Sequence, residues 1–276
     1  MSDDPPSDDT LADWLGQPTH SPADSAANAL RSVRAGGRPA LPKRFYGKAG
    51  FAPAEGGFRL TLDGRPANTP AKQPLTVSTE ALANAVAVEW EAQVEVIDPA
   101  AMPLTRLANT AIDGVAPRFG EVAKDLCAYA RTDLVVYRAG DPARLVAAQA
   151  AAWDPVLDWA HEALGARFIL SEGIRHVDQP ERSVEALERA VAAIEGPFRL
   201  AAVHTMTTLT GSLLIALSVV HGRLTPEEAW AAAHVDETYQ AEVWGRDEEA
   251  EARMAGRWAE FEAAARMIAL AGTGSA

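Results

Sequence analysis

Between residues 57 and 63, apolar and polar side chains alternate in the pattern of a β-strand. Phe58, Leu60 and Leu62 fall on one face, and the polar residues between them fall on the other. Asp63-Gly64 follows directly, and such a pair favours the positive φ angles of a two-residue hairpin turn. The pattern predicts a small antiparallel sheet between about residues 43 and 74.

A four-residue spacing of apolar side chains predicts a helix after this sheet. Leu82, Val86, Trp90 and Val94 would share one face of it. The preceding Val77-Ser78-Thr79-Glu80 is typical of a helix start, with a staple residue, Ser78 as the N-cap and an acidic first turn. Because Trp90 shares the apolar face, we expect it to lie in the core.

Helical patterns dominate the chain beyond about residue 105. Segments 143–164 and 184–194 are rich in helix, and Thr225-Pro226-Glu227-Glu228 has the composition of a capping box. Two short runs, 134–137 and 168–170, remain open between strands and extended links. The last segment carries an apolar stripe with helical spacing: Met254, Trp258, Phe261, Ala265 and Ile268.

The most apolar run in the chain extends from Met206 to Val220. It has about fifteen residues, whereas a membrane-spanning helix needs about 20. We therefore expect it to form one central helix of a bundle, where Gly211, Ser212 and Ala216 would allow close approach of a neighbour.

Together these elements predict an α+β protein. We expect a small antiparallel β-rich N-terminal domain with one helix, residues 41–104, and a larger all-α helical bundle domain, residues 105–276. Residues 1–40 are rich in Pro and Asp and poor in large apolar side chains, which predicts a disordered lead-in.

Composition narrows the class of partner. The 276 residues carry a net charge of −13, which argues against nucleic acid, because phosphate binding depends on clustered Lys and Arg. The charge suits either solubility alone or contact with a basic or mixed protein surface. Cys127 is the single cysteine, so an intramolecular disulfide, a zinc knuckle and a Cys-x-x-Cys redox pair are excluded. No secretory or transit signal is recognisable, and we expect a cytoplasmic location.

Motifs for chemistry are missing from the sequence. Neither nucleotide-binding fingerprint occurs, nor does the metalloprotease pattern H-E-x-x-H or the nucleophile elbow G-x-S-x-G. We therefore expect no nucleotide, cofactor, metal or catalytic residue, and no membrane insertion. A small-molecule enzyme with a site in the interdomain cleft stays an alternative, because catalytic groups can converge in space alone.

Two stretches combine aromatic residues with carboxylates, residues 88–106 and residues 236–249. Such a combination suits a surface for docking another protein, although an acidic run is also typical of a solvated helix face. Glu237 and Glu248 are eleven residues apart and would face the same side of a continuous helix, unless Gly245 ends it.

These stretches carry a resemblance to a known family. With Phe45-Tyr46 at the start, the chain has D-G-R-P…T-P from Asp63, E-W-x-x-Q from Glu89, M-P-x-x-R from Met102 and Y-Q-x-x-x-W-G from Tyr239. In their order and spacing they resemble the family of ATP synthase F1 complex assembly factor 2, from about residue 43 to residue 269. The positions that match the motifs and are expected to serve the fold are Trp90, Asp63, Gly64, Pro103 and Arg106.

The resemblance implies a function as well as a fold. The family has a β-rich first domain and a helical second domain, with no catalytic residue and no cofactor. Its members hold the unassembled F1 α subunit and prevent its aggregation until it pairs with β, in alphaproteobacteria or in the mitochondrial matrix. A generic acidic adaptor with another partner is the alternative. The residues expected to bind the partner are Glu237, Tyr239, Gln240, Trp244 and Glu248.

Overall fold

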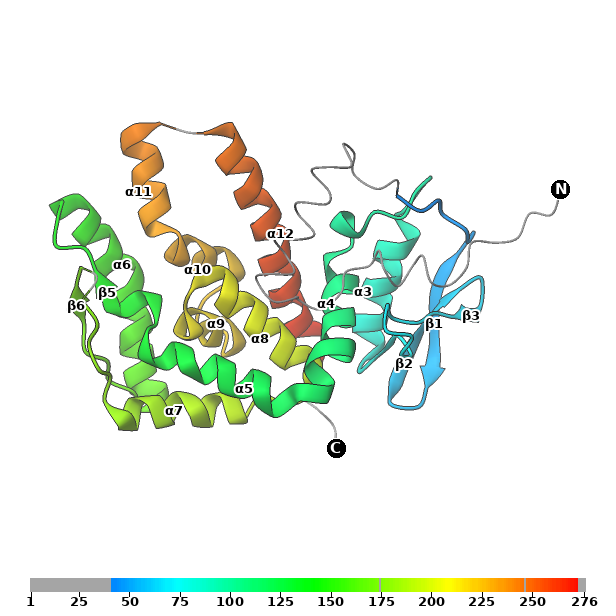
Figure 1. Ribbon diagram of the computed structural model, residues 1–276, viewed down its shortest axis with the longest axis horizontal. Coiled ribbons are helices and arrows are strands. Elements are labelled where there is room, and N and C mark those ends of the chain that lie inside the picture. The colour runs from blue at the N-terminus through cyan, green and yellow to red at the C-terminus, as the bar shows by residue number, and fades with distance from the viewer. Residues whose placement is uncertain (1–40, 174, 246, 273–276) are drawn as a thin grey trace, which may run out of the picture. The chain divides into compact units, whose positions relative to one another are not determined.

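The computed structural model describes residues 41–173, 175–245 and 247–272, so the expected lead-in lies outside the described residues. Two compact units are present (Figure 1). The first ends at Pro117 and also includes Leu270–Gly272, and the second extends from Arg118 to Ala269. A small antiparallel sheet in the first unit and helices in the second confirm the predicted α+β class.

The sheet of the first unit is built around β2. The strands are β1 (Ala49–Ala54), β2 (Gly57–Leu62), β3 (Arg65–Pro66) and β4 (Thr76–Val77). β2 pairs antiparallel with each of the other three, and Ala54 lies opposite Gly57 at the β1–β2 turn. Asp63 and Gly64 have φ angles of 49° and 77°, which confirms the predicted hairpin turn between β2 and β3.

The helix α3 (Glu80–Glu91) packs on β1 and β2. Trp90 is only 3% exposed, so the prediction that it belongs to the core is confirmed. The N-cap is Thr79 rather than Ser78: the Thr79 hydroxyl accepts from Leu82 N–H, while the Ser78 hydroxyl donates to the Ala271 carbonyl. Val94 does not belong to the apolar face as predicted, because α3 ends at Glu91 and the Val94 side chain is exposed.

The rest of the first unit is a series of short helices. A 3₁₀ turn at Pro99–Ala101 leads into α4 (Pro103–Asn109), which continues as a π-helical turn, Thr110–Val115. A further 3₁₀ turn, Ala116–Arg118, connects to the helices of the second unit.

The second unit contains helices and one short parallel strand pair, β5 (Tyr137–Arg138) with β6 (Ser171–Glu172). The two runs left open by the sequence form a 3₁₀ turn, Leu134–Val136, before β5 and an extended link before β6. The helices are α5 (Phe119–Ala128), α6 (Ala143–Trp159) with a π-helical end at Ala160–Leu164, α7 (Glu181–Ala192), α8 (Pro197–Thr210), α9 (Leu213–Val220), α10 (Pro226–Ala233), α11 (Val235–Trp244) and α12 (Glu248–Leu270). The capping box predicted at Thr225 and Glu228 is confirmed at the start of α10.

The apolar run 206–220 does not form the single helix that was predicted. Gly211 has a φ of 70° and ends α8, and the Ser212 hydroxyl then caps α9 by accepting from Ile215 N–H. Hydrophobicity is continuous across the break because both helices are buried there. The break depends on one left-handed residue, a conformation that glycine adopts without strain.

A buried carboxylate supports the second of these helices. Asp133 is fully buried, and its side chain accepts hydrogen bonds from Leu214 N–H at 3.0 Å and Val135 N–H at 3.3 Å. Burial raises the pKa of Asp133 to about 6, although hydrogen bonds from Ser212 and Leu214 oppose the rise. The charged form therefore exists at neutral pH, at the positive end of the α9 dipole.

This environment makes stability depend on pH in a defined direction. The folded pKa of Asp133 lies above the unfolded value of about 3.9, so its proton favours folding below about pH 4, and this contribution is lost as pH rises through 6. We expect the free energy of unfolding of the wild type, relative to Asp133→Asn, to increase by about 2 kcal/mol between pH 6.5 and pH 4.5. Urea unfolding at each pH measures the difference. The exposed control Asp158→Asn should show no such trend, and a flat difference for Asp133→Asn would contradict the assignment.

Candidate partner-binding site

Glu89, the first residue of the E-W-x-x-Q motif, serves the fold. Its carboxylate accepts from Leu104 N–H at 2.8 Å and from both the N–H and the hydroxyl of Thr105 at 2.7 Å. These are donors in the first turn of α4, where Pro103 has no N–H to satisfy. Glu89 thus caps α4 from another helix, which ties the E-W-x-x-Q and M-P-x-x-R motifs together physically. Arg106 of the second motif lies in the last turn of α4.

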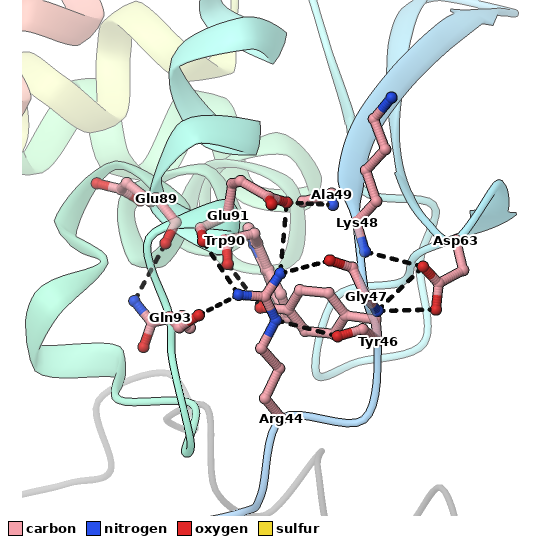
Figure 2. Close-up of polar contacts among 10 residues, drawn as sticks. All are labelled: Arg44, Tyr46, Gly47, Lys48, Ala49, Asp63, Glu89, Trp90, Glu91 and Gln93. Carbon is pink, nitrogen blue, oxygen red and sulfur yellow. Dashed lines mark hydrogen bonds and ion pairs between the residues drawn. The ribbon is translucent and has the colours of Figure 1, made fainter.

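Trp90 and Gln93 also point inward (Figure 2). The Tyr46 hydroxyl donates to the Trp90 carbonyl at 2.7 Å. The Gln93 amide donates to the Glu89 carbonyl and accepts from Asp98 N–H, which fixes the chain as it leaves α3. None of these three motif positions, 89, 90 and 93, presents a free surface for a partner.

Arg44 closes the carboxyl end of α3, as Figure 2 shows. Its guanidinium donates to the carbonyls of Glu91 and Gln93, and also to those of Tyr46 and Gly47. The Glu91 carboxylate lies 3.5 Å from the guanidinium and accepts from Ala49 N–H at 2.6 Å. A cation at the carboxyl end of a helix is favoured by the helix dipole, so this contact stabilises α3 and its junction with β1.

Asp63 has a second structural role beyond its hairpin turn. Its carboxylate accepts from Gly47 N–H and Lys48 N–H, and these backbone hydrogen bonds hold the pKa of Asp63 below its usual value. With Gly64 at the left-handed position, the D-G-R-P motif shapes the β2–β3 turn and ties it to the start of β1. The motifs of the first unit therefore build the unit itself.

The Glu89 cap can be tested by stability. We expect Glu89→Ala to lower the free energy of unfolding by about 2–3 kcal/mol, because two N–H groups at the start of α4 lose their acceptor. Thermal or urea unfolding measures this. Glu95→Ala removes an exposed carboxylate from the same unit and should change stability by less than about 0.5 kcal/mol. Equal effects of the two substitutions would show that Glu89 is no cap.

The arrangement is different in α11 of the second unit, which is fixed against α6 along one face. Asp236 accepts from the buried Gln149 amide at 2.7 Å, and Glu242 forms an ion pair with Arg144 at 2.6 Å. The Arg144 guanidinium also lies 5.9 Å from the centre of the Tyr239 ring. Tyr239 is therefore half-buried and belongs to the face that contacts α6.

Within the described part of the chain, no hydrogen bond or ion pair to another helix is seen on the opposite face of α11. Glu237, Gln240 and Trp244 are three and seven residues apart, a spacing that places them together on one side of the helix. All three are exposed, and Trp244 is 83% exposed with the exposed Val243 beside it. Four of the five residues expected to bind a partner thus have exposed side chains, and three of them share this face.

Glu248, the fifth expected residue, belongs to the next helix. The continuous helix from 237 to 248 considered above does not form: α11 ends at Trp244, Gly245 has a φ of 93°, and α12 begins at Glu248. Asp247 caps α12 by accepting from Glu249 N–H at 2.9 Å. Figure 1 shows α11 and α12 joined at the ends that lie away from α10. We call the exposed residues 237, 240, 243, 244 and 247–249, which extend from the first turn of α11 to the start of α12, the acidic tip.

The base from which α11 and α12 extend is a cluster of aromatic rings. Trp230 of α10 lies 3.9 Å from His234, 5.6 Å from Trp258 and 5.4 Å from Phe261, measured between ring centres. Burial lowers the pKa of His234, whose Nδ1 lies 2.8 Å from the Trp230 carbonyl oxygen. The base is therefore a packed aromatic junction with a largely neutral His234 at neutral pH, and the charges of Glu237 and Arg257 lie near it.

Other kinds of site find no support in the described part of the chain. Within residues 41–173, 175–245 and 247–272, His, Cys, Asp and Glu side chains form no group of three or more that could hold a metal ion. In the same residues, no helix is long and apolar enough to cross a membrane.

Comparison with known proteins identifies the family. Residues 43–161 match the family model of the ATP12 chaperone protein. The crystal structure of Atp12 from Paracoccus denitrificans is 46% identical, with a TM-score of 0.78 over 84% of this chain and 99% of that one. This chain belongs to the ATP12 chaperone family. The ATP12 family is a chaperone family without enzymatic activity, so the resemblance and the expected non-enzymatic class are confirmed.

Two further relatives agree with ATP12 membership. A crystal structure of an Agrobacterium tumefaciens protein described as a chaperone is 46% identical, with a TM-score of 0.83 over 95% of this chain and 96% of that one. The mitochondrial protein atp12 of Schizosaccharomyces pombe is 23% identical over 223 residues, 75% of each chain.

Proposed function

We propose that this ATP12-family chaperone binds the unassembled α subunit of the F1 sector of ATP synthase and prevents its aggregation until the β subunit replaces it. Membership of the family supports the role in ATP synthase assembly. The docking surface that we propose is the acidic tip. Glu237, Gln240, Trp244 and Glu248 would contact the α subunit directly, and Tyr239 would hold α11 in place through Arg144.

The observation that carries this proposal is the exposure of Trp244. A tryptophan side chain that is 83% exposed contributes little to the stability of the fold. Trp is, however, among the residues that contribute most to the binding energy of protein–protein interfaces. Val243 extends the apolar contact, and the carboxylates around it form a polar rim. Such a surface fits a partner patch that is apolar at its centre and has Arg or Lys at its edge.

A chaperone of this kind needs no hydrolysis. A subunit of an oligomer exposes its interface when it is alone, and exposed apolar surface leads to self-association. A binder that covers the interface prevents aggregation by mass action and is displaced by a neighbour that binds more tightly. The missing nucleotide-binding motifs agree with this mode of action.

Charge reversal tests the carboxylates of the tip. We expect Glu237→Lys or Glu248→Lys to reduce the amount of soluble α subunit on co-expression by at least fivefold, because repulsion replaces attraction at the interface. The melting temperature of the chaperone should change little, since both side chains are exposed.

The matched control for charge reversal is Glu185→Lys on the exposed face of α7. It should leave the soluble fraction of the α subunit unchanged. An equal loss with Glu185→Lys would indicate a general charge effect, and no loss at positions 237 and 248 would leave the acidic tip a solvated surface. Failure of the wild type to keep the α subunit soluble would point to another client.

The apolar centre of the tip is tested separately. We expect Trp244→Ala to weaken binding to tagged α subunit at least tenfold in a co-purification titration, because the side chain would be buried only in the complex. Its free energy of unfolding should stay within about 0.5 kcal/mol of the wild type. Ile169→Ala truncates another exposed apolar residue of the same unit and should bind normally. Unchanged binding by Trp244→Ala would exclude the tip as the centre of the interface.

A further inference from the structure

A second exposed apolar surface lies in the first unit, where two extended segments pair. Residues 41–45 run antiparallel to residues 94–98: Lys43 lies opposite Val96, Arg44 N–H donates to the Glu95 carbonyl, and Ile97 N–H donates to the Pro42 carbonyl. Residues that lie opposite each other in an antiparallel pair point to the same face, and alternate residues share it. This register places Leu41, Phe45, Val94 and Val96 on one face, which we call the ribbon face.

The two faces of this pair differ sharply in burial. On the inner face Ile97 is fully buried, whereas on the ribbon face Phe45 is 58% exposed and Val94 is 81% exposed. Leu41 and Val96 are also among the exposed large apolar residues. Single exposed apolar residues are ordinary on a protein surface, but four that share one face of a short paired segment are typical of a binding surface.

The ribbon face also carries a positive charge. Lys43 lies between Leu41 and Phe45 on the same face, is exposed, and has no ion-pair partner among the described residues. An occupant that combines apolar side chains with carboxylates would therefore complement it.

A segment of this chain has that chemistry and is attached at the patch itself. The 40 residues before Leu41 lie outside the described part, and they continue directly from the first residue of the ribbon face. Within them Leu11, Trp14 and Leu15 are spaced three and four residues apart, so a helical turn would place them on one side. Asp8 and Asp9 precede these apolar residues, and Asp13 lies between Leu11 and Trp14.

The chain between this segment and Leu41 is long enough for the segment to reach the ribbon face, and short enough to keep its effective concentration there high. Leu15 and Leu41 are separated by 25 residues, and a flexible chain of that length has a root-mean-square span of about 28 Å. A tether of this length gives an effective concentration on the order of 1 mM. A segment whose free peptide binds with a Kd of about 100 μM would then cover the face about 90% of the time.

We propose that residues 8–15 bind the ribbon face of the same molecule through Leu11, Trp14 and Leu15, with their carboxylates near Lys43. The segment acts as an intramolecular cover that shields the patch from association with other chains. This cover is independent of the proposed binding of the α subunit, because it uses only the N-terminal segment and the first unit.

Thiol labelling of the full-length chain tests the cover. In a Cys127→Ser background, Val94→Cys places one thiol on the ribbon face, and its reaction rate with a maleimide is measured. We expect the rate to rise about tenfold when Leu11→Asp and Trp14→Asp are added, because a face covered about 90% of the time is accessible about 10% of the time. Glu55→Cys, an exposed position in the β1–β2 turn, is the control and should react equally with and without these changes.

The outcomes separate this proposal from its competitors. Equal rates at position 94 with and without the Asp substitutions would overturn the cover. Protection that grows with protein concentration would also overturn it, because a second copy rather than the attached segment would then occupy the face. Protection at position 94 that is independent of concentration and lost in the Asp variant is the expected result.

Discussion

Backbone groups at the ends of buried helices must find partners, and in this protein charged side chains from elsewhere in the chain supply many of them. Glu89 accepts from the first turn of α4, Asp133 accepts from the first turn of α9, and Arg44 donates to the carbonyls at the end of α3. Each contact joins two segments that are separated in sequence. The capping contacts therefore fix the helix ends and the tertiary arrangement within each unit at once.

This use of charge explains why the most recognisable motifs of the chain lie inside it. Trp90 is buried, Glu89 caps a helix, and Asp63 binds backbone N–H groups beside its turn. In such positions a substitution leaves a polar group without a partner, which is more costly than the loss of a surface contact. In the first unit, the residues of the family motifs are therefore those that the unit needs to fold.

A surface suited to a partner is instead formed by residues that make few contacts within their own unit. Trp244 is exposed at the end of a helix whose other face is tied to α6, and the base of that helix is a packed aromatic cluster. A surface that is exposed yet held on a rigid support loses little conformational entropy on binding. A chaperone that works without nucleotide hydrolysis depends on such prepared surfaces, because binding energy is its only means of action.

The sequence by itself determined the elements whose signal is local. The alternation around Leu60, the turn at Asp63-Gly64 and the capping box at Thr225 all appear where the pattern places them, because each depends on residues within a few positions. The motif order also identified the family, and the sequence pointed to Glu237, Gln240, Trp244 and Glu248, whose side chains are exposed.

Only the tertiary structure shows the features that depend on residues far apart in the sequence. Hydrophobicity could not show that Gly211 divides an apolar run, because both resulting helices are buried. Thr79 rather than Ser78 is the N-cap of α3, and both hydroxyls also donate to carbonyls at the far end of the chain, Thr79 to Leu270 and Ser78 to Ala271, contacts that the local sequence does not reveal. The helical repeat places Tyr239 and Trp244 on different faces of α11, but only the fold shows that the Tyr239 face meets Arg144 of α6 while Trp244 stays exposed. Local sequence encodes the preference of a backbone segment, whereas the direction in which a side chain points is fixed by neighbours that only the folded chain brings together.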